Sequence, residues 1–197
     1  MKKIKMTNMI YQVHILLKDS EPKIWRRVQV PTDLLLEDFH KVIQTSMGWT
    51  NSHMHQFISD QKFYTPRITD DEMWNELYNV DYENIKVSKL LKEEGDEIIY
   101  EYDFGDGWQH EIVLEKILPV DQKKQLPVCL GGKMNCPPED VGGTWGYAEM
   151  LRILRQPQHK EHKNYLEWLG GSFDPGHFDL EKVNKLLQEK DFGCIEL

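Results

Sequence analysis

The chain has 197 residues, of which 40% are hydrophobic and 29% charged, the balance of a globular protein that can bury a core. Its formal net charge is −9, from 33 acidic against 24 basic residues. Because duplex DNA is usually bound through a clustered basic footprint, this charge argues against direct nucleic-acid binding. No stretch approaches the roughly 18 apolar residues of a membrane span. Three cysteines, an odd number, and the lack of a signal-peptide pattern at the start predict a reduced, cytoplasmic protein.

The first predicted elements are a flexible arm over residues 1–9 and then two antiparallel strands. Apolar residues alternate from Tyr11 to Leu17, and a second alternating stretch runs over Ile24–Val30. Two adjacent arginines in that second strand, Arg26 and Arg27, point to opposite faces. We therefore expect one buried ion pair and one solvated charge.

A helix is predicted next, opened by Pro31-Thr32-Asp33 and ended by Gly48. Its apolar residues recur at intervals of three and four, which predicts a core-facing stripe made of Leu36, Phe39, Ile43 and Met47.

A third strand is predicted over His53–Ser59, with His53, His55 and Phe57 on one face. Residues 60–86 are acidic and irregular, and predict a variable excursion with one short helix and with Trp74 and Tyr78 as anchors. Ser88 is expected to cap a short helix, Lys89–Glu94, that stops at Gly95.

The strongest local signal is a hairpin over Glu97–Leu114, where apolar and polar residues alternate on both sides of Gly105-Asp106-Gly107. A two-residue turn would set each strand's apolar face against the other's polar face. A three-residue loop pairs Tyr102 with His110 and Phe104 with Trp108, and keeps the aromatic rings together. We therefore predict that loop, with Gly107 in the left-handed position. The buried face then carries Tyr100, Tyr102, Phe104, Trp108 and Ile112, with Asp103 on the other face.

The last third of the chain is predicted to be a long loop followed by helices. Residues 119–143 are rich in proline and glycine, and a structureless stretch of that length is usually functional or wrapped on the core. Wrapping predicts that Cys136 resists thiol reagents. Helices are expected after Thr144, over Glu161–Leu169 and after Asp179.

Together these elements predict an α+β fold. It has an antiparallel or mixed sheet of about five strands, one early packed helix and a C-terminal helical cluster. A ubiquitin-like roll is a variant of this prediction, because the chain starts with a hairpin followed by a helix.

Several ordered motifs resemble one known family. They are IWRRVQVP, FHKVIQTSMGWTNSHMHQF, YEYDFGDGWQHEI, CLGGKMNCPPEDVGGTWGY and YLEWLGGSFDPGHFDL. The chain is similar in this respect to the plasmid pRiA open-reading-frame-three-like family, a bacterial and archaeal family often found near mobile elements. The resemblance covers about Ile10–Leu187 and implies one α+β domain, here residues 10–190, of unassigned activity. Many members of that family read CPPEDCGG where this chain has Val141.

A zinc site is one candidate for chemistry. His53 and His55 on one strand face could act as ligands, with Cys129 or Cys136 completing a nitrogen–sulfur set. The alternative is that both imidazoles are satisfied by backbone and water beside Phe57. Because the family's third cysteine is Val141 here, we expect no stoichiometric metal and no cofactor.

A second candidate is a carboxylate–imidazole site for metal-assisted hydrolysis, using Asp103 with His110 and the nearby acids Asp106, Glu139 and Asp140. Turn chemistry at Asp106 and core packing of His110 explain most of this motif without catalysis.

The favoured function is a binding module whose groove is lined by aromatic residues and Gly/Pro-rich loops and takes a peptide or protein partner. The candidate groove residues are Trp49, His53, His55, Tyr102, Asp103, Trp108, His110 and Trp145. The alternatives are a metal-dependent hydrolase using His53 and His55 or Asp103 and His110, and an accessory protein of mobile elements.

Overall fold

The structure is a computed structural model that describes residues 9–67, 78–121 and 124–195. Its elements are β1 Met9–Leu17, β2 Ile24–Pro31, α1 Leu36–Met47, β3 His55–Ser59, β4 Lys62–Thr65, β5 Asn79–Asp81, α2 Val87–Leu90, β6 Glu97–Tyr102, β7 Trp108–Pro119, β8 Val128–Lys133, α3 Gly143–Leu154, α4 His162–Trp168, α5 Leu180–Leu186 and the 3₁₀ turn η2 Lys190–Gly193. The arm predicted at residues 1–9 lies outside the described residues except for Met9, which begins β1.

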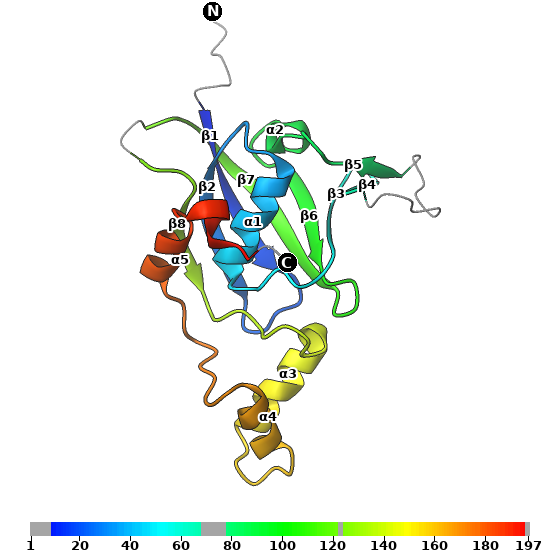
Figure 1. Cartoon of the computed structure of the whole chain (residues 1–197), viewed down its shortest axis with the longest axis vertical. Coiled ribbons are helices and arrows are strands. Elements are labelled where there is room, and N and C mark those ends of the chain that lie inside the picture. Colours follow the sequence, from blue (N-terminus) through cyan, green and yellow to red (C-terminus); the bar gives the residue numbers. More distant parts are fainter. Residues whose placement is uncertain (1–8, 68–77, 122–123, 196–197) are drawn as a thin grey trace, which may run out of the picture.

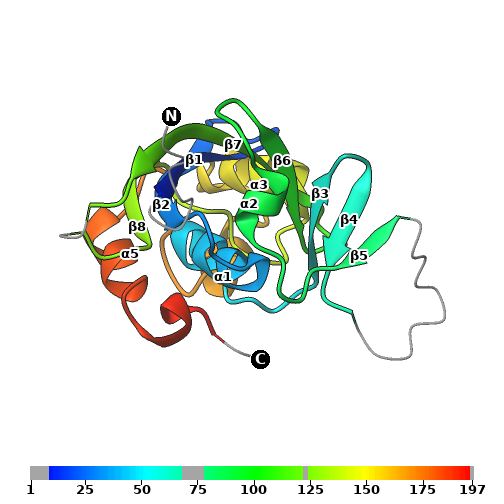
Figure 2. The same cartoon turned by 90° about the horizontal axis from the view of Figure 1, so that it is seen from above.

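All the strands form one mixed sheet in the order β5-β4-β3-β6-β7-β1-β2-β8. Every neighbouring pair is antiparallel except β4 and β5. Figures 1 and 2 show the sheet arched over α1, which packs along one face. The α+β class is therefore confirmed, but the sheet has eight strands and the prediction of about five was wrong.

The extra strands come from segments predicted to be irregular. Both β4 and β5 lie in the 60–86 excursion, and β8 lies in the 119–143 loop and pairs with the edge of β2. Strands β4 and β5 are short, and in β8, at the edge of the sheet, the paired glycines hide the alternation that marks a strand. Trp74 and the short helix expected in the excursion lie outside the described residues, and Tyr78 is 50% exposed.

The predicted stripe of α1 is confirmed. Leu36, Phe39, Ile43 and Met47 are all buried, and the helix ends at Gly48 with a left-handed φ of 101°. Ser88 does not cap the next helix, since α2 already begins at Val87 and ends at Leu90.

The hairpin keeps its predicted face but not its predicted register. Tyr102 pairs with Trp108 and Tyr100 with His110, a shift of two residues that leaves the side chains of the strand residues on the expected faces. The loop is longer because Asp103 takes a left-handed φ of 55° and its carbonyl accepts from the Gly107 amide at 2.6 Å. Phe104 thus falls in the loop and is 51% exposed, so its predicted burial was wrong, whereas Gly107 is left-handed as predicted.

The buried ion pair expected of the two adjacent arginines was wrong, because the buried arginine binds carbonyl groups and the part-exposed one forms the ion pair. Arg26 is 1% exposed, and its guanidinium donates to the carbonyl oxygens of Ser46 at 2.7 Å and Lys133 at 3.0 Å. Arg27, on the part-exposed face, forms the ion pair, with Glu115 at 2.6 Å. Carbonyl partners satisfy the buried donors without the cost of desolvating a carboxylate.

The C-terminal helices form two groups. Helices α3 and α4 pack on each other below the sheet, whereas α5 packs on β8 and α1 (Figure 1). Helix α5 begins directly after Asp179, as predicted, and Asp179 caps it by accepting from the Lys182 amide at 2.9 Å. Helix α3 was expected to begin after Thr144 but begins at Gly143, two residues earlier, so Thr144 is not its cap. No helix among the described residues is both long and apolar enough to span a membrane.

Candidate functional site

Three loops meet at one end of the sheet. They are residues 48–54 between α1 and β3, the hairpin loop 103–107, and residues 136–142 before α3. The Gly142 amide donates to Asp106 Oδ2 at 3.1 Å, and the Thr50 amide donates to Glu139 Oε2 at 3.1 Å. These bonds tie the third loop to the other two, so side chains far apart in sequence share one site.

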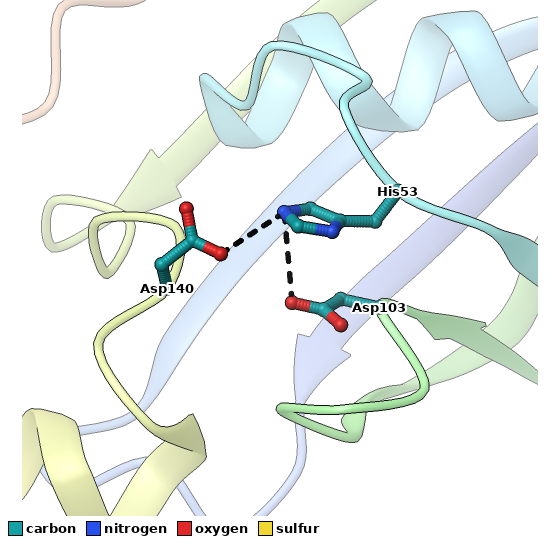
Figure 3. A group of neighbouring side chains, drawn as sticks. All are labelled: His53, Asp103 and Asp140. Atoms are coloured by element: carbon teal, nitrogen blue, oxygen red, sulfur yellow. Dashed lines mark ion pairs between the residues drawn. The ribbon is translucent and has the colours of Figure 1, made fainter.

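Each loop contributes one side chain to a compact group. Figure 3 shows His53, Asp103 and Asp140 pointing toward one another. His53 Nε2 lies 3.7 Å from Asp103 Oδ2 and 3.4 Å from Asp140 Oδ1. The ligand-type atoms all lie within 4.8 Å of one another, and the Nε2 atom is buried with no hydrogen-bond partner among the described residues. One imidazole nitrogen and two carboxylates make a ligand set that zinc and other first-row divalent metals accept.

Local turn geometry orients Asp103. Its Oδ1 accepts from the amides of Gly105 at 3.0 Å and Asp106 at 3.3 Å, which is the side-chain bonding of an Asx turn. The carboxylate is thereby held in one orientation with Oδ2 turned to His53. Asp103 is only 8% exposed, whereas the Asp140 side chain is 72% exposed. The group therefore has one buried and one open side.

A polar layer beside this group involves Glu139. Tyr102 Oη donates to Glu139 Oε1 at 2.5 Å, and Thr50 Oγ1 donates to Glu139 Oε2 at 2.5 Å. Burial, and then the Glu139 carboxylate, raise the pKa of Tyr102 well above its ordinary value. The phenol therefore remains protonated and donates to Glu139.

The other predicted histidines belong to the core. The His55 ring stacks on the His40 ring with centroids 3.4 Å apart, and its Nε2 bonds to Tyr82 Oη at 2.7 Å. His110 is fully buried between Tyr100 and Trp49, with ring centroids 5.4 and 5.1 Å away. Burial lowers the pKa of both histidines.

The structure thus divides the two predicted ligand sets. His53 faces Asp103 and Asp140 instead of joining His55, and His110 does not join the carboxylates. His53 precedes β3 rather than lying in it, so the strand periodicity that put it on the face of His55 does not apply. Cys129 and Cys136 are both buried, and neither belongs to the group of potential ligands found among the described residues.

The predicted groove aromatics also separate. Trp49, Tyr102 and Trp108 are buried, and the Trp49 indole donates to the Pro137 carbonyl at 3.0 Å, which fixes the third loop to the core. Trp145, at the start of α3, is 80% exposed. Thr50 in the first loop, and Tyr165 and Trp168 on α4, were not among the predicted groove residues. The motif YLEWLGG was the available signal for the last two.

The three cysteines differ in their burial, and therefore in their expected reactivity. Cys129 is 2% and Cys136 6% exposed, and burial raises the pKa of both thiols. Thiolate is the reactive form, so we expect Ellman's reagent to label only Cys194 rapidly in the native protein, and all three thiols in denaturant. Rapid native labelling of Cys136, located by mass spectrometry, would show that residues 136–142 open in solution.

Comparison with known proteins gives a consistent result. A family model described as plasmid pRiA4b ORF-3-like protein matches residues 9–182. An uncharacterised protein, y4hQ, of Sinorhizobium fredii (strain NBRC 101917 / NGR234) is 36% identical over 183 residues, 91% of each chain. The crystal structure of a protein of unknown function, MM3350, from Methanosarcina mazei Go1 is similar with a TM-score of 0.79 and 35% identity. That match covers 89% of this chain and 98% of the other.

Proposed function

The chain belongs to the plasmid pRiA4b ORF-3-like family, and since this membership assigns no activity, we propose a function from the site. His53, Asp103 and Asp140 bind a divalent transition-metal ion, and the metal's remaining coordination positions bind a ligand. This proposal departs from the expectation of no stoichiometric metal, which rested on the loop cysteines, because the present ligand set contains no cysteine. The observation that carries this proposal is the buried His53 Nε2. It has no hydrogen-bond partner among the described residues and faces two carboxylate oxygens from two other loops. A metal ion would satisfy the nitrogen and reduce the repulsion between the aspartates.

Binding is favoured over catalysis by the hydrogen bonds of Glu139, the carboxylate next to Asp140 in the chain. It already accepts hydrogen bonds from Tyr102 Oη and from the hydroxyl and amide of Thr50. Each carboxylate oxygen of Glu139 therefore already accepts from a donor that holds the third loop in place, so we assign Glu139 a structural role and not that of a general base. The observation that supports the hydrolase alternative is the number of ligands, because three protein ligands and an open position are typical of catalytic zinc sites.

The proposed site predicts a metal affinity that depends on these three side chains. After dialysis against chelator, the protein should bind about one equivalent of zinc in isothermal titration calorimetry. His53→Ala and Asp103→Asn should each weaken binding by at least about 100-fold, since even outer-shell partners of a metal are worth about 10–100-fold.

The matched control is His177→Ala, which removes an exposed imidazole far from the three loops in sequence. Circular dichroism should show that all variants remain folded. Zinc binding that is absent from the wild type, or that is unchanged in both site variants, would contradict the proposed site.

A further inference from the structure

A groove of about 440 Å³ lies between α3 and α4 and borders the three-loop site through Asp140. Its wall combines acidic residues with apolar and aromatic ones: Asp140, Glu149, Ile153, Glu161, Tyr165 and Trp168. The groove is therefore next to the proposed metal ion but is made mainly by residues that do not bind it.

The charged residues of the groove are all acidic. Glu149 is already paired with Arg152, whose guanidinium lies 2.6 Å away on the solvent side of α3. Glu161 accepts a hydrogen bond from Asn164 at 2.9 Å, and it has no ion-pair partner among the residues that the structure describes. Its negative charge is thus available to a ligand in the groove.

Two aromatic rings complete the wall. Tyr165 and Trp168 lie on α4 with ring centroids 6.2 Å apart and planes at 75°. No residue of the short helix α4 is buried, and Trp168 itself is 47% exposed. The face of an exposed tryptophan attracts a cation, and so does a carboxylate without an ion-pair partner. A cation in this groove is therefore attracted both by the ring and by the charge.

From this combination we infer that the α3–α4 groove binds the lysine or arginine side chain of a peptide segment from another protein. The aliphatic stem of such a side chain would lie against Ile153 and Trp168, and its charged end would reach Glu161. A polyanionic ligand fits poorly. The two aspartates balance the charge of a bound divalent metal, and Glu139 and Glu161 keep the surroundings negative. That the peptide backbone also reaches the metal rests on the proposed function, whereas binding of the basic side chain in the groove does not.

Nuclear magnetic resonance of the full chain tests this inference with two probes, the peptides acetyl-Ala-Lys-Ala-amide and acetyl-Ala-Glu-Ala-amide. In buffer with chelator, the lysine peptide should shift the indole N–H resonance of Trp168 in a saturable way. The glutamate peptide should not, and the indole of Trp145 should stay unmoved. Glu161→Gln should weaken the binding of the lysine peptide roughly fivefold, which corresponds to the loss of about 1 kcal/mol of charge interaction.

The matched control is Glu167→Gln, which removes a carboxylate of the same helix that pairs with Lys163 outside the groove. It should leave the affinity unchanged. Equal shifts from both peptides, no shift of Trp168, or an affinity unchanged in Glu161→Gln would overturn the inference. Because the titration runs without metal, absence of zinc binding leaves its outcome unaffected. Repeating it with zinc shows whether the two sites are coupled.

Discussion

Acidification should unfold this protein between about pH 6.5 and pH 4, because three buried histidines must remain neutral in the folded state. Burial lowers the pKa of His40 and of His110 from 6.5 to about 4, and burial beside His40 lowers that of His55. A bond to Asn51 opposes the shift of His40, but burial dominates.

The direction of this pH dependence follows from proton binding. Below pH 6.5 these histidines bind protons in the unfolded chain but stay neutral in the folded chain. The free energy of unfolding therefore falls as pH drops, and the loss is complete below about pH 4. For each of His40 and His110 the loss amounts to roughly 3 kcal/mol, a large share of the 5–15 kcal/mol typical of a domain. Above pH 6.5 these groups should leave the stability constant.

Urea unfolding at a series of pH values measures this effect. His110→Leu is the informative variant, because His110 is fully buried and its Nε2 has no hydrogen-bond partner among the described residues. Between about pH 6.5 and pH 4, this variant should lose roughly 3 kcal/mol less of its free energy of unfolding than the wild type. It should remain folded at neutral pH. His177→Gln, at an exposed position, should keep the wild-type profile. If His110→Leu loses stability with pH as steeply as the wild type, His110 is not a cause of the acid instability.

The second large effect is expected at Gly146, where α3 meets the third loop. A Cβ at this position would lie 2.0 Å from the Val141 carbonyl oxygen, next to Asp140 in the chain. Backbone cannot yield as a flexible side chain would, so Gly146→Ala should displace α3 from residues 136–142. We expect a loss of about 3 kcal/mol in the free energy of unfolding.

The same substitution should weaken zinc binding, because Asp140 would move with the loop. Calorimetry of Gly146→Ala beside Ala148→Ser, an exposed position on the same helix, separates this effect from a general loss of helix stability. If Gly146→Ala keeps the free energy of unfolding and the zinc affinity of the wild type, the close approach of Gly146 to the Val141 carbonyl is not required.

Much of the fold is determined locally and could be predicted from the sequence. The stripe of α1, the left-handed Gly48 and Gly107, and the shared face of the hairpin aromatics follow from period and turn chemistry alone. A shift of two residues in the hairpin preserved that face, which is why the burial of Tyr100, Tyr102 and Trp108 was predicted although the pairing was not.

The candidate site was decided only by the tertiary structure. His53, Asp103 and Asp140 lie in three loops, where no periodicity fixes the direction of a side chain. Their meeting depends on long-range contacts: Asp106 with Gly142, Thr50 with Glu139, and Trp49 with Pro137. The sequence showed that these residue types were present. Only the closure of the loops determined which histidine faces the carboxylates and which lie in the core.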